Sequence, residues 1–372
     1  MLVGVPKEIK THEYRVGLIP GSVRELVHHG HKVVVQSQAG VGIGVTDAEY
    51  EAAGAAIAGD ADEVFAKADM IVKVKEPQSA EYKKLRGGQI LFTYLHLAAE
   101  RELTKALIES GCTAIAYETV TDAAGGLPLL APMSEVAGRM SIQAGAHCLE
   151  RAQGGRGILL GGVPGVPPAD VLILGGGVAG TNALRTAIGL GARVTVIDKS
   201  VRRLNELEFH FGASLTTVYA TIDAVERRAP HVDLIVGAVL VPGAAAPKLV
   251  TKAMLGHMRK GAVLVDISID QGGCFETSRP TTHAEPSFIL DGVVHYCVTN
   301  MPGAVPRTST FALNNVTLPF VTALANKGYR KALADNAHLK NGLNVHRGKV
   351  TFEAVAREFS HVFTLADTAL AS

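Results

Sequence analysis

A glycine-rich segment is the first feature of the sequence that could do chemistry. Residues 175–180 read Gly-Gly-Gly-Val-Ala-Gly and fit the pattern G-x-G-x-x-G. In such a segment Gly175 allows a tight turn, Gly177 lets the backbone approach a pyrophosphate, and Gly180 lets a helix pack closely on a strand. The N-terminus of the helix that follows offers unpaired N–H groups and a positive dipole end to phosphates. The pattern therefore predicts a dinucleotide-binding site.

The flanking residues supply the context that this pattern requires. An apolar strand over 171–174 leads in, a helix from Asn182 to Leu190 follows, and a strand over 193–197 ends at Asp198. The Asp198 carboxylate can accept hydrogen bonds from a ribose diol and would repel a 2′-phosphate, which favours NAD over NADP. Two nearby arginines soften that preference. The structural alternative is a glycine turn in an ordinary βαβ unit.

Four further polar side chains fall at or after the ends of predicted strands. Arg15 follows a strand over 1–5, Lys75 ends one over 70–75, His96 ends one over 90–96, and Asp270 follows one over 262–267. Ligands of open α/β sheets bind outside the carboxyl ends of the strands. Arginine and lysine suit an anionic substrate, and histidine, with an unperturbed pKa of about 6.5, suits proton transfer. A carboxylate such as Asp270 can stabilise a cationic group.

Each of these four residues also has a structural interpretation. Arg15 could form a surface ion pair, and Lys75 could be a solvated strand end. His96, which stands between two leucines, could be an interior histidine. Asp270 could shape the turn before Gly272 and Gly273.

Composition and charge narrow the class of protein. The 372 residues suggest two domains, and 47% hydrophobic residues are ample for their cores. The net charge of +1 and the lack of a basic run argue against binding to nucleic acid or to a membrane surface. The N-terminus carries charges where a signal peptide would be apolar, and the four cysteines lack C-x-x-C spacing. We therefore expect a cytoplasmic protein with reduced thiols.

Three closely spaced histidines do not predict a metal site. His28, His29 and His31 lie at the end of a predicted helix, where imidazolium groups complement the helix dipole. A carboxylate or cysteine at ligand spacing is lacking near them. No metal is therefore expected.

A repeated helix–glycine–strand unit indicates the fold class. It occurs around Gly30, Gly111 and Gly191. The recurrence predicts an α/β protein with two Rossmann-like domains and largely parallel sheets. Because the dinucleotide segment starts in mid-chain, we expect the NAD domain, residues 131–304, to be inserted in a discontinuous substrate domain formed by residues 1–130 and 305–372. We also expect Ser22 and Ser134 to cap helices that run to about His29 and Arg151, and a helical tail.

Several stretches of the sequence resemble bacterial alanine dehydrogenases. They are Gly4–Glu8, Arg15–Val16, Lys75–Pro77, Tyr94–Ala98, Pro132–Arg139, Asp266–Gly273 and Asn300–Ala304. The resemblance covers essentially the whole chain and implies reversible oxidative deamination of L-alanine to pyruvate and ammonia with NAD. The nearest relative of that family is the NAD-binding subunit of proton-pumping transhydrogenase. A catalytically silent NAD-binding protein of that kind is the alternative.

The resemblance also implies roles for individual residues. Arg15 and Lys75 would bind the substrate carboxylate or carbonyl oxygen, and His96 and Asp270 would take part in proton transfer. Besides Gly175, Gly177, Gly180 and Asp270, the positions implied to contact NAD are Ser134, Val178, Ala179, Asp198, Arg203, Ala220, Val239, Leu240, Ile267, Arg279, Val298, Asn300 and Met301. Arg203 stands where lysine is usual in that family. Ala220 stands where serine is usual, so position 220 lacks the side-chain hydroxyl that could contact the cofactor. The family is usually homohexameric.

Overall fold

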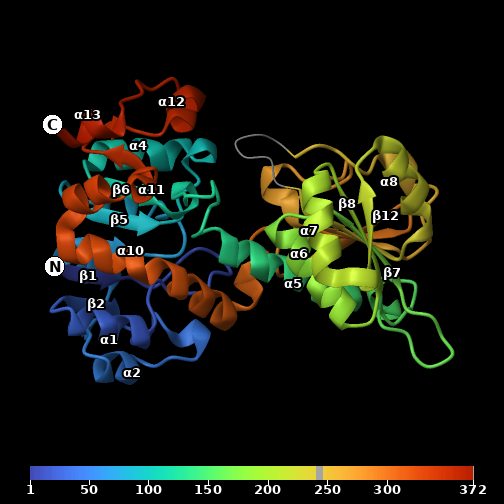
Figure 1. The fold of residues 1–372 in the computed structure, drawn as a ribbon. Helices are drawn as coiled ribbons and strands as arrows, with labels where there is room; N and C mark the ends of the chain where they lie inside the picture. Colours follow the sequence, from blue (N-terminus) through green and yellow to red (C-terminus); the bar gives the residue numbers. More distant parts are fainter. Residues whose placement is uncertain (240–245, 372) are drawn as a thin grey trace. The chain divides into compact units, whose positions relative to one another are not determined.

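The computed structural model describes residues 1–239 and 246–371, and the chain forms two compact units (Figure 1). The first unit consists of Met1–Met133 and Val305–Ser372, and the second unit of Ser134–Ala304. The first is thus built from two separate segments of the chain. Among the described residues no helix is both long and apolar enough to cross a membrane.

The first unit contains an eight-stranded sheet in the order β15-β14-β6-β5-β4-β1-β2-β3. The strands from β6 to β3 in this order pair in parallel, and β14 and β15 add an antiparallel edge. The strands are β1 (Leu2–Val5), β2 (Lys32–Gln36), β3 (Ala56–Ala58), β4 (Met70–Val72), β5 (Ile90–Thr93), β6 (Thr113–Ala116), β14 (Leu343–His346) and β15 (Lys349–Val350).

Helices cover both faces of this sheet because its strands are apolar on both sides. Alternate residues of each strand enter different cores. Val72 and Phe92 pack with residues of α1 and α10, whereas Ile71 and Leu91 pack with residues of α3 and α4. The helices are α1 (Pro20–His28), α2 (Asp47–Ala52), α3 (Ala61–Lys67), α4 (Arg101–Ser110), α10 (Pro306–Asp335), α11 (Ala337–Lys340), α12 (Glu353–Phe359) and α13 (Ala366–Ala371).

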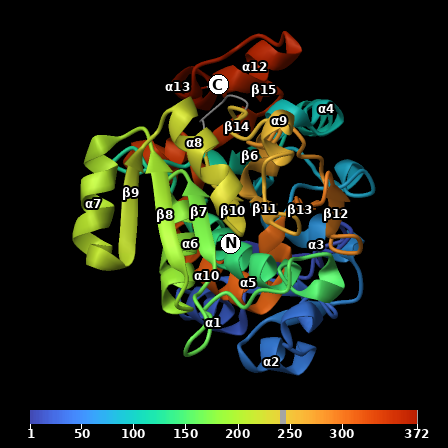
Figure 2. The same cartoon turned by 90° about the vertical axis from the view of Figure 1, so that its right-hand side faces the viewer.

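The second unit contains a seven-stranded sheet in the order β12-β13-β11-β10-β7-β8-β9, in which only β12 is antiparallel (Figure 2). Its strands are β7 (Asp170–Leu174), β8 (Arg193–Asp198), β9 (Leu215–Tyr219), β10 (Leu234–Gly237), β11 (Val263–Asp266), β12 (Ser287–Leu290) and β13 (Val293–Tyr296). Its helices are α5 (Ala131–Cys148), which begins in the first unit, α6 (Val178–Gly189), α7 (Val201–Phe211), α8 (Ile222–Arg228) and α9 (Lys252–Leu255).

The parallel parts of the two sheets share one strand order. In each, the chain adds two strands outward on one side of the first strand and then returns to add strands on its other side. This is the doubly wound arrangement, and it confirms the predicted α/β fold class. The order reverses between β1 and β4 in the first unit and between β7 and β10 in the second. Ligands of such sheets bind beyond the carboxyl ends of strands at this reversal.

Several predicted element boundaries were wrong. Ser22 and Ser134 lie inside α1 and α5, which begin at Pro20 and Ala131. A proline in the first turn of each helix explains the earlier start, because proline has no N–H to satisfy there. Helix α6 begins four residues earlier than predicted, within the glycine-rich segment. The tail is not wholly helical, since it also forms β14 and β15.

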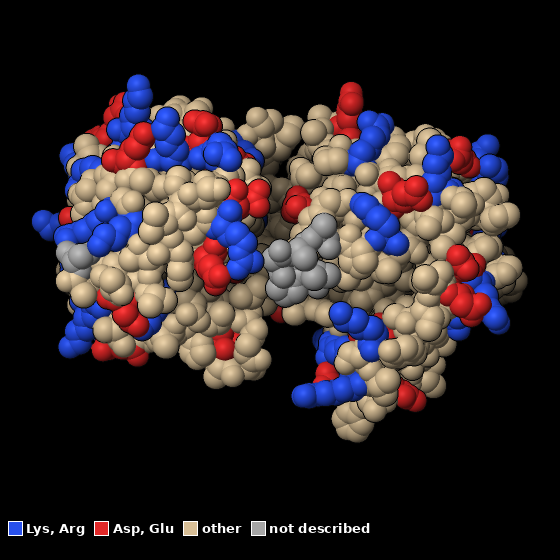
Figure 3. Space-filling view, turned by 90° about the horizontal axis from the view of Figure 1, so that it is seen from above, with Lys and Arg blue, Asp and Glu red and all other residues tan. Residues whose placement is uncertain are grey.

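Charged side chains are interspersed on the surface. On the face shown in Figure 3, lysines and arginines alternate with aspartates and glutamates over the described residues of both units. This mixing agrees with the net charge of +1.

Candidate active site

The glycine-rich segment between β7 and α6 has the shape that the sequence pattern predicts. Gly175 has a positive φ of 97°, and a Cβ there would lie 2.7 Å from the Ala238 carbonyl oxygen. A side chain at Gly180 would overlap the Gly175 carbonyl oxygen, which shows how closely α6 approaches β7. A Cβ at Gly177 would meet nothing within 4 Å. The open approach at Gly177, next to the start of α6, fits a bound pyrophosphate.

Asp198 and Arg203 both hold this segment in place. Asp198 accepts hydrogen bonds from the Gly176 and Ser200 N–H groups at 2.7 and 2.8 Å. Arg203 donates from Nε to the Gly176 carbonyl oxygen at 2.7 Å and from Nη2 to Thr181 Oγ1 at 2.6 Å. Arg203 thus braces the segment through two of its nitrogens.

Most of the other predicted cofactor residues lie beyond the carboxyl ends of parallel strands of the second unit. Val178 and Ala179 form the first turn of α6 after β7, Ala220 follows β9, Val239 follows β10, Ile267 and Asp270 follow β11, and Val298, Asn300 and Met301 follow β13. Leu240 lies outside the described residues. Ser134 and Arg279 are not at strand ends: Ser134 lies in α5, and Arg279 lies in the loop before β12 with its guanidinium 4.2 Å from the Phe288 ring centroid.

The loop after β11 is organised by Asp266, a residue that the sequence reasoning missed. Asp266 is fully buried and accepts hydrogen bonds from the N–H groups of Ser268 and Cys274 and from the Ser278 hydroxyl. Burial raises the pKa of this carboxyl, and the hydrogen bonds oppose that rise. Asp270 lies exposed in the 3₁₀ turn Ile267–Gln271 that Asp266 caps.

Arg15 lies in the loop after β1 and is only 2% exposed. Its Nε and Nη2 donate to the two carboxylate oxygens of Glu13 at 2.7 and 2.5 Å, and its Nη1 lies 3.0 Å from Met133 Sδ. Burial lowers the pKa of the guanidinium, but the hydrogen bonds and charge of Glu13 outweigh it and raise the pKa overall. The alternative of a surface ion pair is wrong, because the pair is buried.

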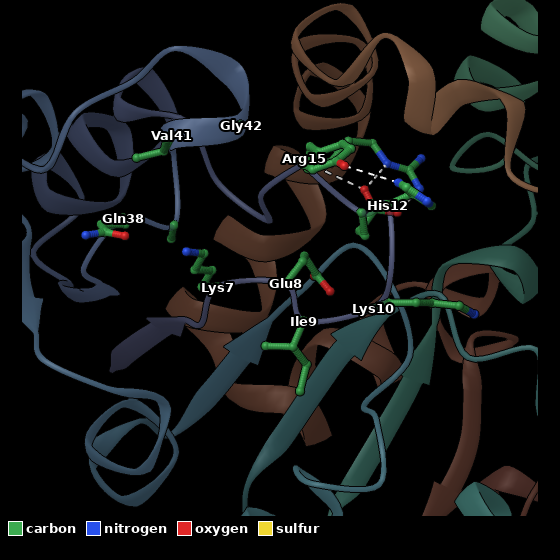
Figure 4. A pocket seen from close by; sticks show the side chains of 12 residues that line it. Lys7, Glu8, Ile9, Lys10, His12, Arg15, Gln38, Val41 and Gly42 are labelled. Atoms are coloured by element: carbon green, nitrogen blue, oxygen red, sulfur yellow. Dashed lines mark hydrogen bonds and ion pairs between the residues drawn. The ribbon is translucent and has the colours of Figure 1, made fainter. Parts of the chain in front are cut away.

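A pocket of about 350 Å³ lies beside this pair in the first unit (Figure 4). Its walls come from the loop after β1 and from the segment after β2: Lys7, Glu8, Ile9, Lys10, His12, Glu13, Tyr14, Arg15, Gln38, Ala39, Val41 and Gly42. Arg15 is thus the one predicted substrate residue among its lining residues. Lys75 and His96 lie elsewhere at the same end of the sheet, in the loops after β4 and β5.

A buried ion-pair network lies next to the loop that carries Lys75. Lys73 is fully buried, and its Nζ donates to Glu8 at 3.1 Å and to Glu81 at 3.0 Å. Glu8 also accepts a hydrogen bond from the Val74 N–H at 2.7 Å. Burial raises the pKa of Glu8 against the opposing attraction of Lys73. The sequence held a signal for this network, since a lysine within the apolar run predicted as a strand over 70–75 needs a partner when it is buried.

His96 lies three residues beyond the end of β5, and its side chain is exposed. The interior interpretation is therefore wrong. Its ring stacks nearly parallel on the ring of Tyr94, with 5.9 Å between centroids and 10° between planes. Its backbone N–H donates to Glu118 at 2.6 Å. Sequence reasoning missed Glu118, and nothing local in the sequence distinguishes it.

Comparisons with known proteins cover both units. The model of the alanine dehydrogenase/PNT N-terminal domain matches residues 4–137, and that of the C-terminal domain matches residues 141–353. An alanine dehydrogenase of Halomonas elongata is 63% identical over 96% of this chain and 97% of its own. One of Mycolicibacterium smegmatis is 55% identical over the full length of both chains.

Solved structures give the same result. An L-alanine dehydrogenase superposes with a TM-score of 0.94 at 53% identity, covering 97% of this chain and 99% of that one. A transhydrogenase from Sinorhizobium meliloti gives 0.81 at 26% identity, covering 95% and 100%. The resemblance predicted from the sequence motifs is confirmed: the chain belongs to the alanine dehydrogenase/PNT family.

Proposed function

We propose that this protein catalyses the reversible oxidative deamination of L-alanine to pyruvate and ammonia with NAD. The observation that carries this proposal is the similarity to alanine dehydrogenases over the whole length of the chain. The open glycine cradle before α6 adds a site whose shape fits the cofactor. We assign substrate binding to the first unit and NAD binding to the second.

The second unit would hold the cofactor at the carboxyl end of its sheet. Bound NAD supplies the acceptor for hydride, and the protein binds and orients it. Gly177 and the first turn of α6 would receive the pyrophosphate, and Asp198 the ribose hydroxyls. The other assigned contacts are those at the strand ends named above. The Asp198 carboxylate supports the use of NAD over NADP.

Arg15 and Lys75 would bind the substrate carboxylate. The edge of Arg15 formed by Nε and Nη2 is engaged by Glu13, whereas Nη1 lies against the sulfur of Met133. The positive charge of this guanidinium would attract a substrate carboxylate. Lys75 would add its charge from the loop after β4.

His96 and Asp270 would serve the proton transfers. Oxidation of the amino group gives an imine, to which water adds before ammonia leaves, and each of these steps moves a proton. An exposed imidazole on an ordered loop suits that exchange near neutral pH. The exposed Asp270 carboxylate can stabilise a cationic imine or ammonium group.

The first experiment is an NADH absorbance assay on the purified protein. One arm contains pyruvate, ammonium and NADH, and the reverse arm contains L-alanine and NAD. Glycine, serine, lactate and NADP serve as controls. We expect turnover in both alanine arms and little with lactate. Turnover with lactate but not with alanine would contradict the proposal.

The assigned proton-transfer residues can be tested in the same assay. His96→Ala and Asp270→Ala should each remove all but a small residual rate of turnover, because each removes a group that exchanges or stabilises a proton. Binding of NADH, followed by fluorescence titration, should persist in both variants. Wild-type rates in either variant would contradict the role given to that residue.

A catalytically silent NAD-binding subunit is the second candidate, and the structural similarity to a transhydrogenase favours it. It predicts NADH binding without turnover of any amino acid and copurification with a membrane protein. The assay therefore separates the two functions.

We further propose that the protein assembles as a homohexamer, as its family usually does. Light scattering coupled to size exclusion should give six times the chain mass of 39.0 kDa. A mass of one or two chains at working concentration would contradict this assembly.

A further inference from the structure

Glu118 makes contacts that link it to the candidate proton-transfer residue. Both of its carboxylate oxygens lie 3.2 Å from the Leu95 amide nitrogen, and Oε1 lies 2.6 Å from the His96 amide nitrogen. One carboxylate thus accepts the N–H groups of two consecutive residues. These residues stand where the chain leaves β5 and enters the 3₁₀ turn Leu97–Ala99.

The pairing of two strands brings these residues together. Strands β5 and β6 run parallel, and Thr93 lies opposite Ala116 at their carboxyl ends. Leu95 and Glu118 each follow that pair by two residues. Glu118 lies in the 3₁₀ turn Tyr117–Thr119 and is only partly exposed, so it reaches across to the neighbouring loop from an ordered position.

His96 adopts a backbone conformation that needs such support. Its φ is +49°, in the left-handed region that residues other than glycine rarely occupy. Because its side chain is exposed, packing of the imidazole into a core cannot stabilise this conformation. The Tyr94 ring supports only one side of the imidazole, and the Tyr94 hydroxyl is itself fixed by a 2.5 Å hydrogen bond to the Leu129 carbonyl oxygen.

We propose that Glu118 is a positioning residue for His96, which holds the loop after β5 so that the imidazole is presented for proton transfer. The hydrogen bonds to an ionised acceptor are the stronger kind, and two of them converge on the turn that His96 must make. This inference rests on the proposed function, in which His96 exchanges protons with the substrate.

Three variants test the proposal. Glu118→Ala removes the acceptor, Glu118→Gln keeps a neutral one, and Glu100→Gln removes a nearby exposed charge whose side chain does not cap α4. We expect kcat for pyruvate amination to fall about 100-fold in Glu118→Ala, since small misplacements of reacting groups cost about that much. Glu118→Gln should stay within about 10-fold of the wild type because it keeps weaker hydrogen bonds. Glu100→Gln should match the wild type, and the KM for NADH should be unchanged throughout.

A double variant shows whether Glu118 acts through His96. If it does, His96→Ala with Glu118→Ala should have the residual rate of His96→Ala alone, measured at high enzyme concentration. Losses that multiply would overturn the proposal, as would a Glu118→Ala variant with the wild-type kcat.

Amide hydrogen exchange tests the contact between Glu118 and the loop after β5 without measuring enzyme activity. The amides of residues 95 and 96 should exchange faster in both Glu118 variants, whereas those of β6 should not change. Unchanged exchange at 95 and 96 would overturn the inference even if alanine turnover is normal. If the wild type shows no turnover, the proposed function is contradicted instead. Hydrogen exchange in the Glu118 variants would still show whether Glu118 holds the amides of residues 95 and 96. Should Glu118→Ala fail to fold, Glu118→Gln carries both readouts.

Discussion

In each of the two units, acidic side chains hold loop backbone in place. In the first unit, Glu8 accepts a hydrogen bond from the Val74 N–H, and Glu118 accepts one from the His96 N–H. In the second unit, Asp198 accepts one from the Gly176 N–H, and Asp266 accepts one from the Cys274 N–H. Each lies next to a loop that carries a candidate functional residue. Hydrogen bonds to charged groups contribute about 1.5–3 kcal/mol each, so a loop with few apolar contacts can still be ordered. Site geometry therefore depends on residues that need not touch the substrate.

At the scale of single residues, Arg15→Lys tests the carboxylate-binding role. Lysine keeps the charge but lacks the planar fork with which Arg15 engages both carboxylate oxygens of Glu13. We expect kcat/KM for pyruvate to fall at least about 10-fold, which corresponds to about 1.4 kcal/mol, with little change in the KM for NADH. Arg24→Lys, an exposed arginine on α1, is the matched control. Equal effects on pyruvate and NADH would argue against this role.

At the scale of elements, the contact between β7 and α6 determines what each glycine does. Gly180 lets α6 pack closely on the end of β7, whereas a Cβ at Gly177 would meet no protein atom within 4 Å. The two glycines of one motif therefore differ in their surroundings: one lies against the strand, and the other faces open space.

Two alanine substitutions separate those roles. Gly180→Ala should lower the thermal midpoint, because its Cβ would overlap the Gly175 carbonyl oxygen. Gly177→Ala should change the midpoint little, since its φ of −66° suits alanine and its Cβ meets no neighbour. Gly177→Ala should nevertheless weaken NADH binding about 10-fold or more, because the methyl group would occupy the pyrophosphate approach. Differential scanning fluorimetry and NADH titration measure the two effects, and normal NADH affinity in Gly177→Ala would contradict the assignment.

At the scale of the whole molecule, the C-terminal tail completes the first unit. Strand β14 pairs with β6 and places His346 in the interior, where the residue is 0% exposed. Its Nδ1 lies 3.0 Å from Thr113 Oγ1, and its Nε2 lacks a hydrogen-bond partner among the described residues. Burial, with a smaller contribution from Arg347, lowers the pKa of His346 to about 4.

This buried histidine makes stability depend on pH. The unfolded chain takes up the His346 proton near pH 6.5, whereas the folded chain resists it until about pH 4. The contribution of neutral His346 to the free energy of unfolding is therefore complete above pH 6.5. As pH falls from 6.5 toward 4, the free energy of unfolding decreases by at most about 3 kcal/mol because of this residue. We expect His346→Gln to lose less stability than the wild type over that range in urea unfolding. The exposed His361→Gln should follow the wild type, and parallel curves for wild type and His346→Gln would contradict the prediction.

Local patterns in the sequence determined the fold class and the nucleotide-binding segment. Apolar strands, the glycines at 175, 177 and 180, and Asp198 lie within one βαβ unit, and their roles depend on neighbours close in the chain. Helix starts were less predictable. Ser22 and Ser134 looked like caps, but a proline earlier in each segment begins the helix first.

Only the tertiary structure decided which partners hold the candidate residues. Glu118 reaches His96 because β5 and β6 pair in one register, and Glu8 reaches Lys73 across 65 positions of the chain. Such pairings depend on strand order and register, which no local pattern encodes. The sequence thus specifies which side chains can do chemistry, whereas the packing of strands from distant segments specifies their partners, burial and orientation.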